Sequence, residues 1–369
     1  MAIVGLGTSK LAAGKSKSTG QFLISRGVQL FYAFGWLFAF TVPFRWELLA
    51  LAVASYYLRM FFVTAGYHRY FSHMTFQTSR AFQFFLAFMA ETSVQQGVCW
   101  WAAHHRQHHR QCDTEKDPHS PSRLGFWKSH MLWVEDADNY ETHWELVPDL
   151  VKFPEIVAVS ESFLIPPTLY GAAIYLLGGY DVFIWAFVVS TWAVSHGTFL
   201  VNSANHIWGR ERFICQYQPG CTAKNNWWVT VFTLGEGWHN NHHANMKVCR
   251  QGIYWYEIDI TYYVLRVLQA LGIVWNIREP NYEGVDRRKA EFLEYKAKLA
   301  GANVAHAAGL DSTLLSKHSH DNEDIDAPVV ADGPASAAAA AAAAAAVDED
   351  TTTERRYPQR SRTPSRSTR

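Results

Sequence analysis

Eight histidines in three short clusters constrain the fold of this 369-residue chain more than any other feature. They are His68 and His73 in HRYFSH, His105, His108 and His109 in HRQHH, and His239, His242 and His243 in HNNHH. Imidazole is neutral near pH 7 and is a good ligand for iron, copper, zinc or nickel, whereas burying it without a partner costs free energy. Eight rings are too many for one ion and suit two. The fold must therefore bring three distant segments together.

The spacing inside the clusters indicates how the rings are presented. A helix turns about 100° per residue, so each H-x-x-H-H cluster gathers its three rings within an arc of roughly 100°. His68 and His73 are five residues apart and would diverge by about 140° on a straight helix. We therefore expect this pair to converge only where a helix ends or distorts.

Composition excludes some partners. The 33 basic and 33 acidic residues cancel, so no global charge points to nucleic acid or to an acidic partner. The 15 Trp and 17 Tyr fit the interfacial belts of a membrane protein. Five cysteines form no C-x-x-C pair and no even disulfide framework, which indicates a reducing compartment. Residues 1–20 lack the apolar core of a signal peptide.

Four apolar stretches are each near the twenty or so residues needed to cross a bilayer. They cover residues 28–44, 47–67, 159–180 and 182–205, and short connectors join them into two antiparallel hairpins. Arg59 is a charged residue within the second apolar stretch. Its side chain could snorkel to the membrane surface, or the helix could continue beyond the bilayer at this point. Residues 81–90 are too short to span, and the charges in 253–275 favour an amphipathic helix.

Shared metals require all the clusters to lie on one side of the membrane. Four spans meet this requirement, because an even number of crossings separates every cluster from the N-terminus. The leader carries Lys10, Lys15, Lys17 and Arg26, against Arg45 alone in the opposite-side turns, so the positive-inside rule makes this side cytosolic.

The expected fold is therefore all-α: an integral membrane protein with four transmembrane helices in two hairpins and a helical cytosolic cap that holds the histidines. We expect a polar cytosolic leader at 1–27 and a membrane domain at 28–300, with the cap formed by 68–158 and 206–300. Residues 301–369 include ten consecutive alanines and a Ser/Arg-rich end, and are expected to be a disordered tail.

The chemistry of the ligands narrows the choice of metal. Zinc hydrolases use three protein ligands and an open position, and the H-E-x-x-H motif of helical zinc proteases is absent. Soluble di-iron oxygenases use Glu and Glu-x-x-His, but no carboxylate lies within these clusters. A di-iron site made almost wholly of imidazole remains, at the boundary between membrane and cytosol.

In this context the chain resembles the membrane fatty acyl desaturases, and within them the delta-9, stearoyl-CoA desaturase-like group. The resemblance covers roughly residues 28–280. It rests on the three histidine boxes in order, and on DPHSP at 117–121, GFWKSH at 125–130, NSANH at 202–206 and GEGW before the third box. One box alone would be weak, whereas three boxes with their context are specific.

The resemblance implies roles for further residues. His206 becomes a ninth metal ligand, Asn202 reaches a metal through water, and Thr198 with Phe199 resembles the pair that lines the substrate tunnel. Asp113, Asp117 and Glu236 are candidates to orient the ligating rings through their free N–H groups, or are ordinary surface carboxylates. The remaining histidines are expected to be structural or surface residues: His104, His119, His130, His143 and His196.

The implied reaction is the O2-dependent removal of two hydrogens from a long-chain saturated acyl chain, with two iron ions as cofactor. The sequence has no haem-binding H-P-G-G and no ferredoxin-type cysteine run, so an external donor, cytochrome b5 or a ferredoxin, is expected to supply two electrons. Acyl-CoA is the preferred substrate. Ala103-His104 stands where animal acyl-CoA desaturases have Arg-Asp, so an acyl-lipid is a nearly equal alternative as the substrate.

The tail favours the endoplasmic reticulum membrane, with a bacterial or plastid membrane as the alternatives. Two other functions remain open. A membrane di-iron hydroxylase would keep the metals and give a hydroxylated product, and a metal-binding scaffold would have lost catalysis.

Overall fold

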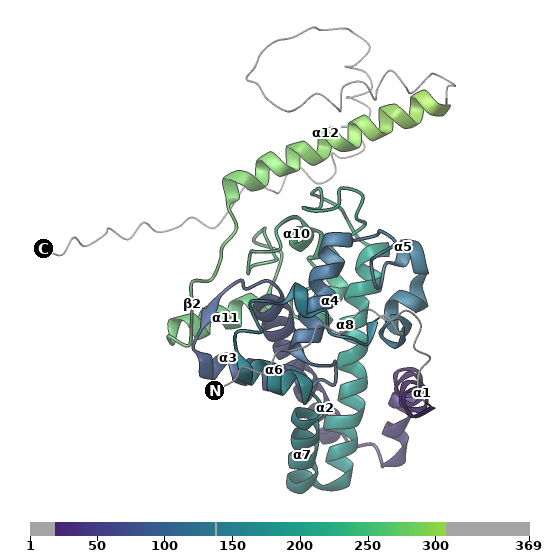
Figure 1. Cartoon of the computed structure of the whole chain (residues 1–369), viewed down its shortest axis with the longest axis vertical. Coiled ribbons are helices and arrows are strands. Elements are labelled where there is room, and N and C mark those ends of the chain that lie inside the picture. Colours follow the sequence, from purple (N-terminus) through teal and green to yellow (C-terminus); the bar gives the residue numbers. More distant parts are fainter. Residues whose placement is uncertain (1–18, 137–138, 308–369) are drawn as a thin grey trace, which may run out of the picture.

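A computed structural model describes residues 19–136 and 139–307 of the chain (Figure 1). The described part is mostly helical, with a single pair of two-residue strands. Most of the predicted leader, residues 1–18, and most of the predicted tail, from residue 308, lie outside the described residues. The first helix begins at Thr19 and the last ends at Ala307, so the predicted domain boundaries at residues 27 and 300 both lie within helices.

The elements follow one another in this order. The first half contains α1 (Thr19–Phe34), η1 (Gly35–Thr41), α2 (Trp46–Phe62), η2 (Val63–Ser72), β1 (Gln77–Thr78), α3 (Arg80–Glu91), α4 (Val98–Gln111), α5 (Pro121–Leu124), η3 (Lys128–Leu132), η4 (Trp133–Glu135), η6 (Trp144–Leu146) and α6 (Pro154–Glu161). The second half contains α7 (Ile165–Phe183), η7 (Ile184–Val189), α8 (Ser190–Ile207), α9 (Trp227–Thr233), α10 (His239–Ala244), α11 (Ile260–Ala270), β2 (Val274–Trp275) and α12 (Tyr282–Ala307).

The second predicted hairpin forms one long helical run, from α7 through the π-helix η7 into α8. Pro166 and Pro167 lie in the first turn of α7, where a missing backbone N–H costs nothing. The run reverses at Gly179, whose φ of +75° lies in the left-handed region that favours glycine. At the lower end of Figure 1, α7 and the segment η7 that follows the turn lie side by side.

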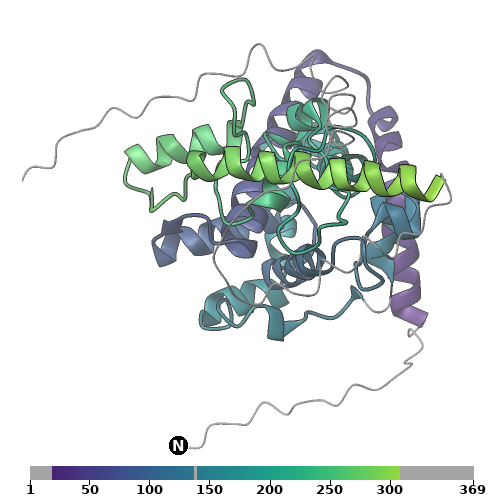
Figure 2. The same ribbon diagram turned by 90° about the horizontal axis from the view of Figure 1, so that it is seen from above.

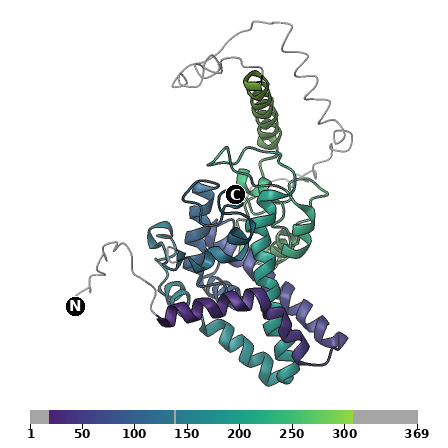
Figure 3. The same ribbon diagram turned by 90° about the vertical axis from the view of Figure 1, so that its right-hand side faces the viewer.

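The first predicted hairpin differs from the expectation. Helix α1 ends at Phe34 and is followed by the 3₁₀ helix η1, so residues 28–44 do not form one continuous helix. Figure 3 shows α1, in dark purple, lying across the long helices. Two described stretches, Trp46–Ser72 and Ile165–Ile207, are long and apolar enough to cross a membrane. The count of four transmembrane helices is therefore not confirmed and stays a prediction.

Arg59 neither snorkels nor reaches solvent. It is fully buried in α2, where its guanidinium donates to the Thr191 hydroxyl at 2.6 Å and also to the Ser190 hydroxyl. The backbone carbonyls of Ser55, Thr92 and Phe187 accept the remaining hydrogen bonds. Arg59 thus ties the first long helix to η7 and α8.

The cap lies at one end of the long helices and carries the histidine clusters. Its main hydrophobic core packs η2 against α3 and α4 through buried residues such as Phe71, Leu86 and Ala103. Strands β1 and β2 pair antiparallel, with Gln77 opposite Trp275 and Thr78 opposite Val274. Seen from above, α12 crosses over this end of the molecule (Figure 2). The cap therefore brings segments far apart in the sequence around one buried centre.

Candidate metal centre

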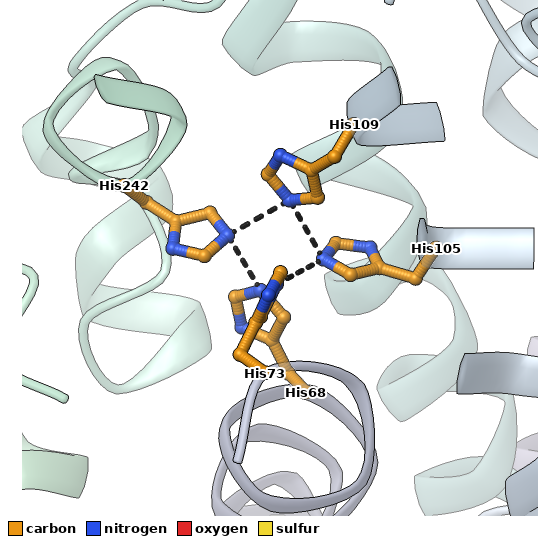
Figure 4. A group of neighbouring side chains, drawn as sticks. All are labelled: His68, His73, His105, His109 and His242. Carbon is orange, nitrogen blue, oxygen red and sulfur yellow. Dashed lines mark hydrogen bonds between the residues drawn. The ribbon is translucent and has the colours of Figure 1, made fainter. Parts of the chain in front are cut away.

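The first group of converging imidazoles contains five histidines, contributed by η2 and the residue that follows it, by α4 and by α10 (Figure 4). They are His68, His73, His105, His109 and His242. Neighbouring Nε2 atoms are separated by 2.9 Å along the series His73, His105, His109, His242 and His68. One ring nitrogen cannot donate to two such neighbours at once, so hydrogen bonding alone does not account for this packing.

The second group contains four histidines from α4, α8 and α10. They are His108, His206, His239 and His243. Nε2 of His206 lies 3.1 Å from Nε2 of His239, while the Nε2 atoms of His108 and His243 are buried without a hydrogen-bond partner. The ring centroids of His109 and His243 are 4.2 Å apart, so the two groups adjoin.

Helix geometry explains how the second and third clusters each contribute to both groups. Residues four apart share a helix face, so His105 and His109 of α4 enter the first group while His108 enters the second. On α10 the same rule places His239 and His243 in the second group and His242 in the first. The clusters are therefore divided between two sites, which their common spacing did not reveal.

The pair separated by five residues converges through a distortion, as the sequence predicts. Residues Val63–Ser72 form a π-helix, in which i→i+5 hydrogen bonds widen the turn, and His73 directly follows its end. The rings of His68 and His73 lie 5.0 Å apart between centroids.

Burial favours the neutral form of five of the converging rings. Burial lowers the pKa of His105, His109, His239, His242 and His243 well below the usual histidine value, and the neighbouring rings lower it further. A neutral imidazole keeps a lone pair on one nitrogen, which is the form that binds a metal. The nine converging rings, several with Nε2 atoms that face one another, form an environment that fits metal ions.

The spacing is informative about coordination number. Metal–imidazole bonds of about 2.0–2.1 Å place ligand nitrogens at right angles to one another about 2.9 Å apart, whereas tetrahedral angles need about 3.4 Å. The 2.9 Å separations in the first group therefore suit right-angled ligation. Five rings also exceed the four ligands of a tetrahedral zinc site.

Two predicted carboxylates contact rings directly. Asp117 Oδ1 accepts from Nδ1 of His108 at 2.9 Å, and Glu236 Oε2 lies 2.5 Å from Nδ1 of His68. Burial opposes ionisation of both acids, but the paired histidine outweighs it, together with Arg69 for Glu236. The pKa of Asp117 is held below its usual range and that of Glu236 is lowered to about 2. Each carboxylate therefore holds a ring through Nδ1, which leaves Nε2 directed toward the other rings of its group.

The third predicted carboxylate, Asp113, lies farther from its histidine than the other two do. Its Oδ2 lies 3.8 Å from Nδ1 of His206 and accepts from both the backbone N–H and the hydroxyl of Thr222. The Thr222 hydroxyl itself lies 3.3 Å from Nδ1 of His206. Asp113 therefore fixes the loop beside the ring more firmly than the ring itself.

Several neighbours of the centre were not anticipated from the sequence. Arg69 joins Glu236 to Asp259, and Gln251 donates to Glu236 at 2.7 Å. Cys112 and Cys221 form a disulfide between the end of α4 and the loop before α9, which corrects the expectation of no disulfide framework. They are 109 residues apart and have no motif spacing, so only the fold could pair them.

A cavity of about 910 Å³ adjoins the first group. Asn202, Thr198 and Phe199 line it, as does His105 of the first histidine group. Gln95 donates to the Thr198 hydroxyl at 3.0 Å. Most of the surface is apolar and aromatic, contributed by α1, α4, α7 and α8. The three residues that the sequence placed at a tunnel and near the metals therefore share one cavity.

Fold and site together define a helical protein with a paired polyhistidine centre beside a long apolar cavity. A sequence model of the fatty acid desaturase family matches residues 44–277. The chain belongs to this family.

Individual relatives fit this assignment. A probable chloroplastic lipid desaturase of Arabidopsis thaliana is 35% identical over 64% of this chain and 65% of its own length. An sn-1 stearoyl-lipid 9-desaturase of Anabaena variabilis is 34% identical over 66% of this chain and 89% of its own. An acyl-CoA C20 Delta5-desaturase of Anemone leveillei is 34% identical over 68% and 79%. The chain thus spans slightly less than two thirds of the first of these relatives.

Proposed function

We propose that the chain is a membrane-bound delta-9 fatty acyl desaturase that uses two iron ions, O2 and two electrons from an external donor. The observation that carries the proposal is the convergence of nine histidines, eight of them buried and His105 half-buried, into two adjoining groups at the wall of an apolar cavity. The cavity volume lies in the range typical of ligand pockets and suits an alkyl chain.

The proposed ligands of one iron are the five rings of the first group, and those of the other are the four rings of the second. Right-angled nitrogen spacing and a ligand set above four favour iron over zinc. Iron with O2 supplies the oxidising power that removes hydrogen from an unactivated methylene, which no protein side chain can do.

The protein residues position and shield this chemistry. Asp117 and Glu236 hold His108 and His68 with Nε2 facing inward, and the proposed role of Asn202 is a water-mediated contact with a metal. Thr198 and Phe199 form part of the wall that would hold the alkyl chain beside the first group. Position nine follows from the resemblance and from the relatives named as 9-desaturases.

The proposal also covers the location of the protein and its electron donor. The two long apolar helical stretches favour an integral membrane protein with its cap in the cytosol. The endoplasmic reticulum remains a prediction from the tail, whereas the named relatives include chloroplastic and cyanobacterial proteins. Cytochrome b5 and ferredoxin are the two candidate donors.

Expression of the full chain in a desaturase-deficient host, followed by analysis of fatty acids, tests the activity. A new cis-monoene with its double bond at carbon nine is expected. A variant with His206→Ala should give none, while His143→Ala, which alters a histidine outside both groups, should match the parent chain. A hydroxylated product, or no new product from a protein that contains iron, would contradict the proposal.

A further inference from the structure

Three of the five cysteines gather beside the second histidine group. Cys112, Cys215 and Cys221 are all buried in one small cluster, and Cys112 is bonded to Cys221. A ring nitrogen of His206 lies within 4.8 Å of both sulfurs of this disulfide, and a ring nitrogen of His243 lies within 4.8 Å of the Cys221 sulfur. The disulfide therefore borders two of the four rings proposed to hold the second iron.

The disulfide joins two segments that support these rings. Cys112 directly follows α4, which carries His108, and Cys221 belongs to the loop between α8 and α9. The next residue of that loop, Thr222, donates from its backbone N–H at 2.7 Å and from its hydroxyl at 2.8 Å to Oδ2 of Asp113. One covalent bond and two hydrogen bonds thus fasten the loop to the end of α4.

The same loop also contacts the other two helices of the second group. The backbone N–H of Gln216 donates to the carbonyl of His243 on α10 at 2.9 Å. The backbone N–H of Lys224 donates at 2.7 Å to the carbonyl of Asn205 on α8, directly before His206. Because the loop touches all three helices, breaking its covalent bond to α4 would loosen the support of the whole group.

The disulfide also affects one ring directly. The sulfur of Cys221 lies 3.4 Å from Nδ1 of His243. A disulfide sulfur carries no hydrogen, so in this contact only the ring can donate, and the lone pair is then on Nε2, the atom that faces the second group without a hydrogen-bond partner among the described residues. A thiol at the same place has its own hydrogen to donate to Nδ1. The disulfide therefore favours the ring form that binds a metal, and the thiol does not.

The location of the bond suits reversible chemistry. The cap is predicted to face the cytosol, where thiols are kept reduced and disulfides are usually transient, catalytic or redox-sensing. Pro219 and Gly220 directly precede Cys221 and are exposed. Cys221 is itself 8% exposed, against 2% for Cys112, so an incoming thiol reaches the sulfur of Cys221 first.

We propose that Cys112 and Cys221 form a reversible thiol–disulfide modification site that controls iron binding by the second histidine group. A protein dithiol of the thioredoxin class attacks the Cys221 sulfur, the S–S bond breaks and Cys112 leaves as a thiol. The second thiol of the reductant then displaces Cys221, so the pair gains two electrons and two protons while the reductant becomes a disulfide. The inference rests on the proposed function, because it takes the second group as an iron site.

The state of the cysteines is measured first. Full-length protein purified without reductant is denatured in N-ethylmaleimide, digested and analysed by mass spectrometry, before and after equilibration of the folded protein with reduced thioredoxin. A linked pair of peptides containing Cys112 and Cys221 is expected before reduction, and two alkylated cysteines after it. Glutathione disulfide should restore the link. Alkylation of both cysteines without reduction, or a bond that the folded protein does not exchange, would overturn the inference.

The link to the metal is measured by anaerobic titration of oxidised and reduced apo-protein with ferrous iron. Reduction is expected to weaken one of the two binding steps about tenfold and to lower the temperature of unfolding of the apo-protein. The double variant Cys112→Ser/Cys221→Ser should behave as the reduced protein under both conditions. Cys99→Ala, which alters a buried cysteine near the other end of α4, should respond to reduction as the parent chain does.

The outcomes separate this inference from the proposed function. Equal iron affinities of the oxidised and reduced parent protein would overturn the inference and leave the proposed function intact. Absence of ferrous binding in both states would instead contradict the metal centre on which the proposed function depends.

Discussion

The Nδ1 atom of His108 lies 2.9 Å from Oδ1 of Asp117, while its Nε2 atom is buried without a hydrogen-bond partner. The carboxylate also accepts from the backbone N–H groups of Asp113 and His119, so the loop after α4 holds it in place. One side of the ring is thus fixed by the protein, and the other is left for a ligand.

Asp117→Asn is expected to weaken metal binding about 10- to 100-fold, because an amide oxygen is a weaker acceptor and leaves the ring less basic. Titration of apo-protein with ferrous iron under anaerobic conditions measures the change. Glu145→Gln, at an exposed carboxylate beside His143, serves as the control. Unaltered affinity in Asp117→Asn would show that the pair has a structural role only.

Removing one ring from each group tests the division of nine ligands between two ions. His73→Ala alters only the first group and His206→Ala only the second, so each is expected to lower iron content from about two per chain toward about one. Both should abolish desaturation. Metal analysis of purified protein provides the measurement, with His143→Ala as the control. A full complement of iron in either variant would exclude that histidine as a ligand.

The sequence predicted which histidines converge better than it predicted how they are arranged. Histidine spacing and family context named all nine rings that converge, and the five-residue interval of His68 and His73 required the helical distortion found in η2. Spacing could not show that neighbours on one helix, His108 and His109, serve different groups. That depends on how α4 and α10 face each other, which is set by tertiary packing.

Long-range polar contacts were also beyond sequence reasoning. Arg69 contacts Glu236 and Asp259, which are more than 160 residues away, and no local pattern records such a pairing. Hydropathy likewise found the stretches 159–180 and 182–205, which largely coincide with the helical run Ile165–Ile207, but it did not show that residues 28–44 are divided between α1 and η1. An apolar surface is compatible with a membrane span and with a helix that lies across others, so composition does not distinguish them.

Arg59 provides a test of packing among the long helices. Its guanidinium makes five hydrogen bonds inside the protein, to Ser55, Thr92, Phe187, Ser190 and Thr191. Lysine has three donors and no planar fork, so Arg59→Lys should leave buried acceptors unsatisfied and destabilise the fold by about 2–4 kcal/mol.

Thermal unfolding in detergent measures this effect. The matched variant is Arg45→Lys, where an exposed ion pair with Asp181 is expected to contribute less than about 1 kcal/mol. Equal effects of the two substitutions would show that Arg59 is not held as the hydrogen bonds indicate.

Glu91 should make stability depend on pH. It is fully buried, its Oε1 accepts from the backbone N–H of Val98 at 3.0 Å, and its Oε2 has no partner. Burial raises its pKa from the ordinary 4.5 to about 8, despite the opposing hydrogen bond from Val98. The folded protein therefore binds a proton that the unfolded chain releases between pH 4.5 and 8, and stability must fall as pH rises through this window.

Glu91→Gln imitates the protonated acid and removes the titration. At pH 7 it is expected to stabilise the protein by up to about 3 kcal/mol, since each pH unit above the unfolded pKa contributes about 1.4 kcal/mol. Thermal unfolding between pH 5 and pH 8 gives the comparison, with Glu141→Gln at an exposed position as the control. The parent and control proteins should lose stability with rising pH, whereas Glu91→Gln should show a flatter profile. A parallel loss in all three proteins would assign the pH dependence to other groups.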